Sequence, residues 1–182
     1  PPTNDERFWV NAQLADTDYR DGFDAADAVA GDVENLKSFS EVVFLVDKTG
    51  SMADDVETIF YAAHEIIRRL PFETWTSVIY FGDRNTNPSD WYDYQPMEGN
   101  SENLINRLKG VNYGGGGGDK VSIYDALYTS IRRTKWESHG TRRVYVITDA
   151  QPHVGVKSRY SVNDVNDAAE KYGVDIKIIS IQ

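Results

Sequence analysis

The sequence predicts an α/β fold with a mostly parallel central sheet flanked by helices. Segments of strand character occur at 42–46, 76–81, 143–148 and 174–181. The first of these is a continuous apolar run, which is typical of a strand buried on both faces of a parallel sheet. Helical patterns alternate with the strands, and the length of 182 residues suits one ordinary domain with some chain to spare.

The first two predicted helices follow the strands at 42–46 and 76–81. Residues 54–70 carry apolar side chains at helical spacing, and Pro71 ends the pattern. A polar, aromatic-rich connection leads to a short helix at 102–108, for which Ser101 is the expected N-cap. The aromatic residues of this connection fit either a binding surface or a loop anchored on the core, and the sequence leaves both open. These residues are Trp91, Tyr92, Tyr94 and Met97.

Two further helices complete the alternating pattern. The first, at 122–136, follows a run of five glycines at 114–118, where backbone can approach another loop closely. The second covers 162–172, with Ser161 as its expected N-cap and Gly173 at the position after its C-terminus.

The segment 1–40 differs from the remainder of the chain and is predicted to be an acidic extension packed on a domain at 41–182. Residues 1–41 contain ten acids and three bases, a net charge of −7, whereas the whole chain carries −10. A short helix near 24–38 is expected within the extension. The spacing of the aspartates at 16–24 resembles a calcium loop out of register, so a solvated acidic loop is the expectation there.

Composition excludes several classes of function. The net charge of −10 argues against binding to nucleic acid or to an anionic membrane surface, both of which need a basic face. No apolar run approaches the roughly 20 residues of a membrane-spanning helix. The absence of cysteine excludes disulfides, thiolate zinc sites and thiol catalysis. The compartment stays open, although the acidic composition and the missing N-terminal methionine favour a cell-surface or exported protein.

Three loops with unusual polar residues leave the carboxyl ends of predicted strands. The first carries Asp47, Thr49 and Ser51, the second is the glycine-rich run 114–119, and the third carries Asp149. In parallel sheets the carboxyl ends of the strands form the usual ligand site. The expected donors are all oxygen atoms, the ligands that Mg²⁺ and Mn²⁺ prefer. The sequence therefore predicts a divalent-metal site at this edge.

Three motifs carry a resemblance to a known family: VFLVDKTGSM, GGGGGDKVSIYDAL and VYVITDAQPH, in this order. They resemble the metal-ion-dependent adhesion site of von Willebrand factor type A (VWA) domains, and the resemblance covers 41–182. It implies a Rossmann-like sheet with Mg²⁺ or Mn²⁺ at its top. Thr49 and Ser51 would be direct hydroxyl ligands, and Asp47 and Asp149 would bind directly or through water. It further implies a protein-binding module, not an enzyme, whose partner completes the coordination with an acidic side chain.

The middle loop departs from the family pattern. The family ligand in this loop is usually a threonine, or a glutamate in some relatives. Counting back from Asp125 places Val121 at that position, whereas counting forward from Asp119 places Ser122 there. Valine cannot bind a metal, so Ser122 is the favoured ligand, with Asp119 as its competitor.

The chain also stops after its predicted last strand at 174–181, where the family continues with another strand and a terminal helix. Either the chain is truncated there or the acidic extension covers that flank of the sheet.

Asp54 and Asp55 suggest a second metal ion. The sequence DKTGSMADDV has the spacing of the integrin β-subunit I-like domain, in which paired aspartates help hold a regulatory calcium beside the adhesion ion. This resemblance implies a possible Ca²⁺ site at Asp54 and Asp55. The alternative is that two acids in the first helical turn interact favourably with the helix dipole.

Two rival interpretations remain. The run Asp-Lys-Thr-Gly at 47–50 also resembles the phosphorylation motif of P-type ATPases, on a haloacid-dehalogenase-like fold, where Asp47 would be a nucleophile. The paired acids that this chemistry requires near the later strand are missing at 148–152. The other rival is a VWA scaffold with a non-functional metal site.

Overall fold

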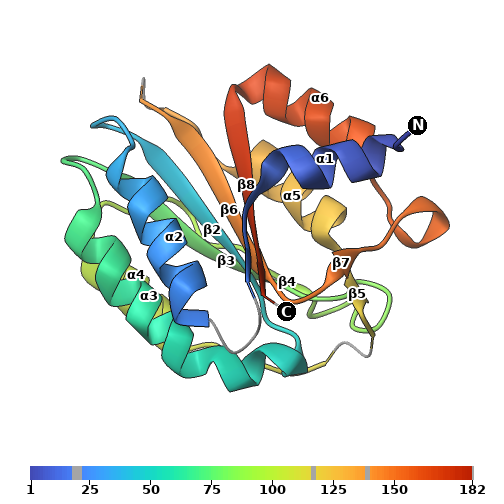
Figure 1. Ribbon diagram of the computed structural model, residues 1–182, viewed down its shortest axis with the longest axis horizontal. Helices are drawn as coiled ribbons and strands as arrows, with labels where there is room; N and C mark the ends of the chain where they lie inside the picture. The colour runs from blue at the N-terminus through green and yellow to red at the C-terminus, as the bar shows by residue number, and fades with distance from the viewer. Residues whose placement is uncertain (18–21, 116–117, 138–139, 182) are drawn as a thin grey trace.

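The computed structural model describes residues 1–17, 22–115, 118–137 and 140–181. Within these residues the chain forms a sheet of six strands, in which all neighbours are parallel except β3 and β4. In order across the sheet the strands are β1 (Gln13–Thr17), β8 (Val174–Ile181), β6 (Arg142–Thr148), β2 (Glu41–Asp47), β3 (Trp75–Phe81) and β4 (Tyr92–Asp93). The mostly parallel sheet that the sequence predicts is therefore confirmed (Figure 1).

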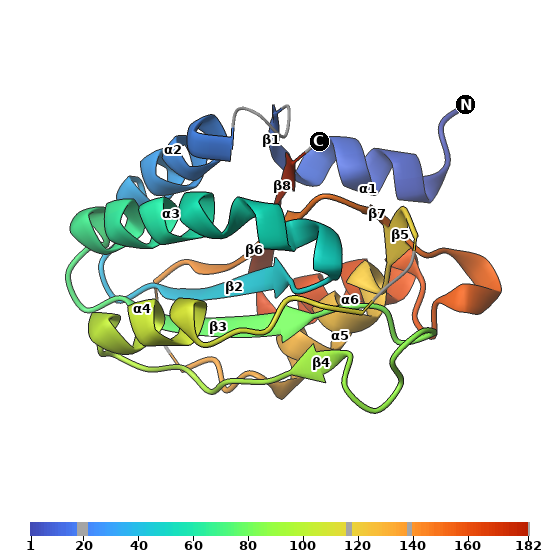
Figure 2. The same ribbon diagram turned by 90° about the horizontal axis from the view of Figure 1, so that it is seen from below.

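Helices cover both faces of the sheet. On one face lie α2 (Gly22–Glu34), α3 (Val56–Arg69) and α4 (Ser101–Lys109). On the other face lie α1 (Asn4–Ala12), α5 (Ile123–Arg133) and α6 (Val162–Tyr172). Figure 2 shows the two layers of helices on either side of the strands. None of the helices in the described ranges is long and apolar enough to cross a membrane.

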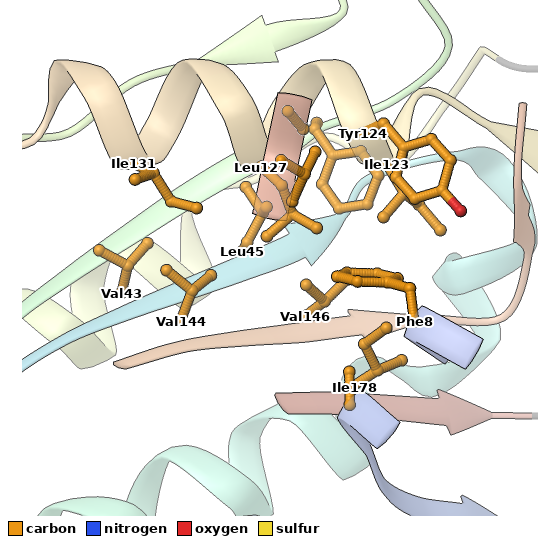
Figure 3. Packing of buried hydrophobic residues seen from close by; sticks show 14 of the residues in the cluster. Phe8, Val43, Leu45, Ile123, Tyr124, Leu127, Ile131, Val144, Val146 and Ile178 are labelled. Atoms are coloured by element: carbon orange, nitrogen blue, oxygen red, sulfur yellow. The ribbon is translucent and has the colours of Figure 1, made fainter. Parts of the chain in front are cut away.

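Strand β2 explains why the sheet needs cover on both faces, because all seven of its residues are buried. Val42, Phe44 and Val46 pack toward α2, α3 and α4. Val43 and Leu45 point the opposite way and belong to the apolar cluster that includes residues of α1, α5 and α6. Figure 3 shows them with Phe8 of α1 and the apolar face of α5. Alternate residues of a strand point to opposite faces, so an unbroken apolar run is what a central strand requires.

The N-terminal segment forms part of the sheet. Its helix α2 occupies 22–34, close to the helix expected at 24–38, and packs on α3. Strand β1 pairs in parallel with β8 at the edge of the sheet, beyond the last strand predicted from sequence. Phe8 of α1 packs edge-on against Tyr124 of α5, with ring centroids 5.7 Å apart. The acidic stretch 18–21 lies outside the described residues, so the structure says nothing of the calcium-loop resemblance.

Local capping agrees with expectation at one helix and differs at another. Ser161 and Asp164 form a capping box at the start of α6, and Gly173 ends that helix with a φ of 64°. For α4 the prediction of Ser101 as N-cap is wrong, because the Asn100 side chain accepts the hydrogen bond from the Glu102 amide. Asn and Ser are nearly equal as N-caps, so pattern alone could not choose between neighbouring residues.

The aromatic connection between β3 and α4 is anchored on the core. Trp91, Tyr92, Tyr94 and Met97 are partly buried against the apolar cluster that faces α5. Tyr92 also belongs to the short strand β4, which the sequence did not predict, and its hydroxyl lies 2.9 Å from that of Ser130. Of the two alternatives left open, the structure favours a loop held in place by its aromatic side chains.

Candidate functional site

Asp47 is the last residue of β2 and lies at the edge of the sheet where the parallel strands end, called here the carboxyl edge. Its side chain is 0% exposed. Oδ1 accepts hydrogen bonds from the amide and the hydroxyl of Thr49, at 2.8 and 2.6 Å. Oδ2 accepts one from the hydroxyl of Thr148, the last residue of β6, at 2.7 Å. Both oxygens are thus fixed by neutral donors from one residue in the loop after β2 and one at the end of the adjacent strand β6.

Burial raises the pKa of Asp47 to about 6, because the charged form loses its hydration. The hydrogen bonds from Thr49 and Thr148 oppose this rise, and the negative charge of Asp149 adds to it. The described residues show no ion pair to Asp47. The carboxylate is therefore held in place without a positive partner of its own.

Thr49 and Ser51, the two hydroxyl residues of the loop after β2, come directly after Asp47 in the chain. A 3-10 helix over Gly50–Asp55 begins after Thr49, which places Thr49 Oγ1 and Ser51 Oγ 3.5 Å apart. Thr49 is buried and Ser51 is exposed. The glycine-rich loop lies against this turn, since the Gly50 amide donates to the Gly115 carbonyl at 3.2 Å and the Gly114 amide donates to the Lys48 carbonyl at 3.0 Å. The structure therefore brings the first two loops together.

Asp149 lies close to two other acids. Its charge raises the pKa of both Asp47 and Asp55. Asp55 is 2% exposed, and its Oδ2 has no hydrogen-bond partner within the described ranges. Burial raises the pKa of Asp55 to about 6, with the charges of Asp149 and Asp54 adding to the effect. Asp47, Thr49, Ser51 and Asp149 are called the Asp47 cluster below, and Asp55 adjoins it.

The middle-loop candidates face other partners. Ser122 Oγ accepts a hydrogen bond from the amide of Arg84 at 2.9 Å, and its own amide donates to the Gly82 carbonyl. The Asp119 carbonyl accepts from the amide of Gln151, next to the short parallel pair β5 (Lys120–Val121) and β7 (Gln151–Pro152). No hydrogen bond within the described ranges joins either side chain to Asp47.

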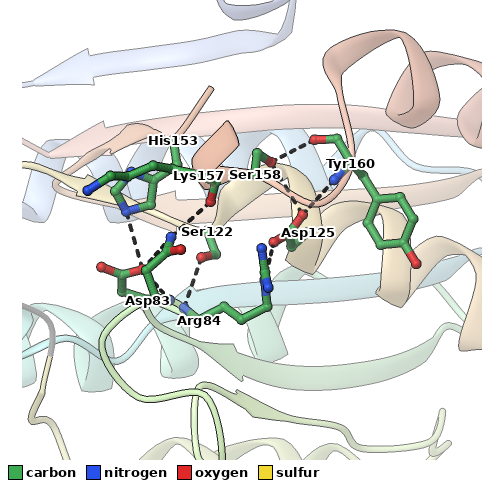
Figure 4. A network of polar contacts seen from close by, with 9 residues as sticks. Asp83, Arg84, Ser122, Asp125, His153, Lys157, Ser158 and Tyr160 are labelled. Atoms are coloured by element: carbon green, nitrogen blue, oxygen red, sulfur yellow. Dashed lines mark hydrogen bonds and ion pairs between the residues drawn. The ribbon is translucent and has the colours of Figure 1, made fainter. Parts of the chain in front are cut away.

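Sequence reasoning missed a second buried carboxylate at this edge, Asp125 in the first turn of α5. Its Oδ2 accepts from Nε of Arg84 at 2.7 Å. Its Oδ1 accepts from the amide of Tyr160 at 2.9 Å and the hydroxyl of Ser158 at 3.3 Å. Figure 4 shows these contacts joining the loops after β3 and β7 to the start of α5. An Asp in a first helical turn is common, so the sequence held no signal for this role.

Asp83 and His153 extend the same network. Nε2 of His153 lies 3.2 Å from Oδ1 of Asp83 (Figure 4). Burial alone would raise the pKa of Asp83, but hydrogen bonds from Thr86 and Asn85, together with the nearby His153 side chain, outweigh it and hold the pKa below its usual value. The Arg84 network, as it is called below, thus differs from the Asp47 cluster in having positive or protonatable partners for its acids. It comprises Asp83, Arg84, Ser122, Asp125, His153, Ser158 and Tyr160.

The acids alone do not make a metal site. Among the described residues, no group of three or more His, Asp or Glu side chains is placed to hold a metal ion. Any ion at the Asp47 cluster would depend on hydroxyl oxygens as well as carboxylates, which is the donor set that the sequence predicts.

Comparison with protein-family models matches residues 41–182 to the von Willebrand factor type A domain. Because this match covers most of the chain, the protein belongs to the von Willebrand factor type A family. Domains of this family commonly bind other proteins. No curated protein matches the chain.

Among solved structures, the chain is similar to the conserved hypothetical protein BatB from Bacteroides thetaiotaomicron, with a TM-score of 0.55 and 20% sequence identity. The likeness covers 78% of this chain and 66% of that one, so this chain spans slightly less than two thirds of BatB. At this identity the likeness supports the fold alone.

Proposed function

We propose that this domain is a divalent-metal-dependent protein-binding module rather than an enzyme, with Mg²⁺ or Mn²⁺ held at the Asp47 cluster. One observation carries the proposal. The Asp47 carboxylate is fully buried and oriented by Thr49 and Thr148, yet it lacks a cationic partner among the described residues. A buried carboxylate is costly unless its charge is paired. A cation at this cluster supplies the missing charge.

The chemistry of the donors fits a hard divalent ion. Asp47 and Asp149 offer carboxylate oxygens, and Thr49 and Ser51 offer hydroxyl oxygens 3.5 Å apart, close enough for one ion to contact both. The Thr49 hydroxyl donates its proton to Asp47, so its lone pairs remain available to a cation. Oxygen-only donor sets favour Mg²⁺ and Mn²⁺ over softer metals.

The remaining protein ligand belongs to the middle loop. Ser122 is our first choice and Asp119 its competitor. Ser122 accepts one hydrogen bond from the Arg84 amide and keeps a second lone pair, whereas the Asp119 side chain is exposed. Loss of metal affinity in Ser122→Ala but not in Asp119→Asn would assign Ser122, and the reverse would assign Asp119.

A second ion, Ca²⁺, is proposed beside the first at Asp54 and Asp55. The support for it is the buried, unpartnered Oδ2 of Asp55, whose pKa is raised by its burial and by nearby acids. A Ca²⁺-specific rise in thermal stability that disappears in Asp55→Asn, while the Mg²⁺ response remains, would support this site.

The partner is proposed to be a protein that places an acidic side chain on the metal ion. Ser51 is exposed beside buried Thr49, so one side of the cluster faces solvent. A metal ion held there has a coordination position that a carboxylate from outside can fill. The acidic character of this chain does not favour nucleic acid as the partner.

The phosphotransferase alternative is weaker because a residue set is missing. A nucleophilic Asp47 would need further acids near the end of β6 to hold Mg²⁺ beside the phosphoryl group. The segment 148–152 that follows β6 contains Asp149 as its single acid. A covalent adduct of Asp47 with beryllofluoride or acetyl phosphate would reverse this judgement.

The proposal is tested by thermal unfolding and calorimetric titration with Mg²⁺ and Mn²⁺. At a metal concentration of 100 times Kd, binding to the folded state stabilises the domain by about 2.7 kcal/mol. Asp47→Ala and Ser51→Ala should abolish this gain. Asp90→Asn, which removes an exposed acid paired with Lys48, is the matched control and should keep it. A wild-type domain that gives no heat and no shift in melting would support the non-functional scaffold instead.

A further inference from the structure

The loop that follows β7 exposes apolar side chains a short distance along the chain from Asp149 of the Asp47 cluster. Residues 153–159, called the valine loop below, begin four residues after Asp149. Val154 is 45% exposed, and Val156, in a short turn over Gly155–Lys157, is 101% exposed. In Figures 1 and 2 this turn, in orange, projects away from the body of the domain next to β5 and β7.

The valine loop is held in a defined shape. The Asn85 side chain donates to the Lys157 carbonyl at 2.8 Å, and the Ser158 hydroxyl donates to Asp125 (Figure 4). Gly155 adopts a φ of 63°, which a side chain would disfavour. The exposed valines therefore lie on a loop that is held by the loop after β3 and by the first turn of α5. A preorganised surface of this kind loses little conformational entropy on binding.

The charge of the valine loop is opposite to that of the whole chain. Lys157 and Arg159 are exposed, and residues 150–160 contain no acid, although the chain carries a net charge of −10. A groove of about 270 Å³, lined by both polar and apolar side chains, lies beside the loop. Its lining includes Asn4, Asp5, Tyr124, Val154, Tyr160 and Val162.

We propose that the valine loop and this groove form a second contact surface for the segment of the partner that brings an acid to the metal ion. The inference rests on the metal-dependent function proposed above. The partner segment places a large apolar side chain against Val154 and Val156, and a further acid opposite Lys157 or Arg159. Asp149 and Val154 are five residues apart, so an extended chain between them spans at most about 18 Å. The apolar residue therefore lies within about five residues of the metal-binding acid.

The experiment is a selection from a displayed random dodecapeptide library on the immobilised domain, in Mg²⁺ and in chelator. The selected peptides are then measured against Val154→Ser/Val156→Ser. Val10→Ser, which changes a valine that is 72% exposed on α1, is the matched control. We expect peptides enriched only in Mg²⁺, each with an acid and a large apolar residue within five positions. The double variant should weaken them tenfold or more, the control should not, and both variants should melt like the parent.

Each failure has a different meaning. Enrichment that needs Mg²⁺ and Asp47 but is unaffected by the double variant overturns the valine loop as a contact and leaves the proposed function standing. Enrichment that is equal in chelator, or no enrichment at all, contradicts the proposed function and this inference with it. Mg²⁺-independent dimers of the parent that the double variant abolishes would assign the surface to a second copy of this chain.

A charge reversal separates the apolar and ionic contributions. Lys157→Glu/Arg159→Glu should change the selected peptides from an excess of acidic to an excess of basic residues beside the apolar position, while the metal-binding acid remains. An unchanged acidic excess would overturn the ionic part of the proposal.

Discussion

Two fully buried carboxylates lie at the carboxyl edge of this sheet, and their surroundings differ. Asp125 meets the guanidinium of Arg84 at 2.7 Å and accepts further hydrogen bonds from Ser158 and Tyr160. Asp47 is equally buried, but its donors are the neutral hydroxyl and amide groups of Thr49 and the hydroxyl of Thr148. Its pKa is raised to about 6 by burial, with the nearby charge of Asp149 contributing.

This difference distinguishes a structural acid from a candidate binding acid. The charge of Asp125 is balanced within the chain, so the Arg84 network holds loops together without help from a ligand. The charge of Asp47 has no balancing cation in the described structure, and Asp149 and Asp55 add further negative charge nearby. The fold thus maintains an acidic cluster at neutral pH whose cost a bound cation would offset.

The largest expected change in unfolding free energy comes from breaking the ion pair between Asp125 and Arg84. Asp125→Ala leaves Arg84 and the Tyr160 amide without their acceptor and should lower the unfolding free energy by about 3 kcal/mol. This value is at the low end for breaking a buried ion pair, because the Arg84 side chain is 32% exposed. Urea denaturation in chelator measures it. Asp93→Ala, which breaks the exposed pair with Arg107, is the control and should cost under about 1 kcal/mol. Equal losses in the two variants would mean that Asp125 has no special structural role.

A substitution at Asp47 is expected to raise the unfolding free energy of the metal-free domain, by a smaller amount. Asp47→Asn removes an unbalanced buried charge and should stabilise the metal-free domain at neutral pH by about 1–2 kcal/mol. The pKa of Asp47 is raised by about two units, so its charged form destabilises the folded state by roughly 3 kcal/mol. Removing the charge recovers this free energy, less about 1 kcal/mol because an amide oxygen accepts weaker hydrogen bonds than a carboxylate. The variant should also lose its response to Mg²⁺. Thermal and urea unfolding in chelator provide the measurement, and a variant less stable than the parent would show that Asp47 is balanced by something else.

The pH dependence of the unfolding free energy of the metal-free domain gives the smallest effect when it is expressed per pH unit. The pKa of Asp47 is about 6 in the folded state, above its ordinary value of 3.8, so the folded state binds more protons between these pH values. The unfolding free energy in chelator should therefore fall as the pH rises from 4 toward 6.5, by at most about 1.4 kcal/mol per pH unit for one group. The slope should be shallower in Asp47→Asn. Identical slopes for parent and variant would contradict the raised pKa.

The sequence predicted the central strands and the Asp47 cluster because both depend on local patterns. A continuous apolar run marks β2, and the polar residues directly after it must lie at the carboxyl edge of a parallel sheet. Strand β1 escaped prediction because its five residues, QLADT, are short and mostly polar or small, and its pairing with β8 joins distant parts of the chain. Such pairing depends on tertiary packing that propensity does not encode.

The middle loop shows the limit of motif counting most clearly. Counting forward from Asp119 places Ser122 at the ligand position, whereas counting back from Asp125 places Val121 there. Neither count could show that the Ser122 hydroxyl accepts a hydrogen bond from the amide of Arg84, a residue 38 positions away. The Arg84 network was also invisible in sequence, since each of its members is an ordinary cap, turn or helix residue when taken alone. Their roles follow from contacts that join the loops after β3 and β7 to the start of α5 (Figure 4).

The central claim is that the Asp47 cluster holds a divalent ion, and a titration with Mn²⁺ followed by electron paramagnetic resonance tests it most directly. The signal of free Mn²⁺ counts the ions bound to the chain. The parent protein should remove Mn²⁺ from solution, and Mg²⁺ should compete for the same site. Asp47→Ala and Ser51→Ala should lose Mn²⁺ binding, while Asp90→Asn should keep it. Equal Mn²⁺ binding by parent and Asp47→Ala, or no binding by the parent, would contradict a metal site at the Asp47 cluster.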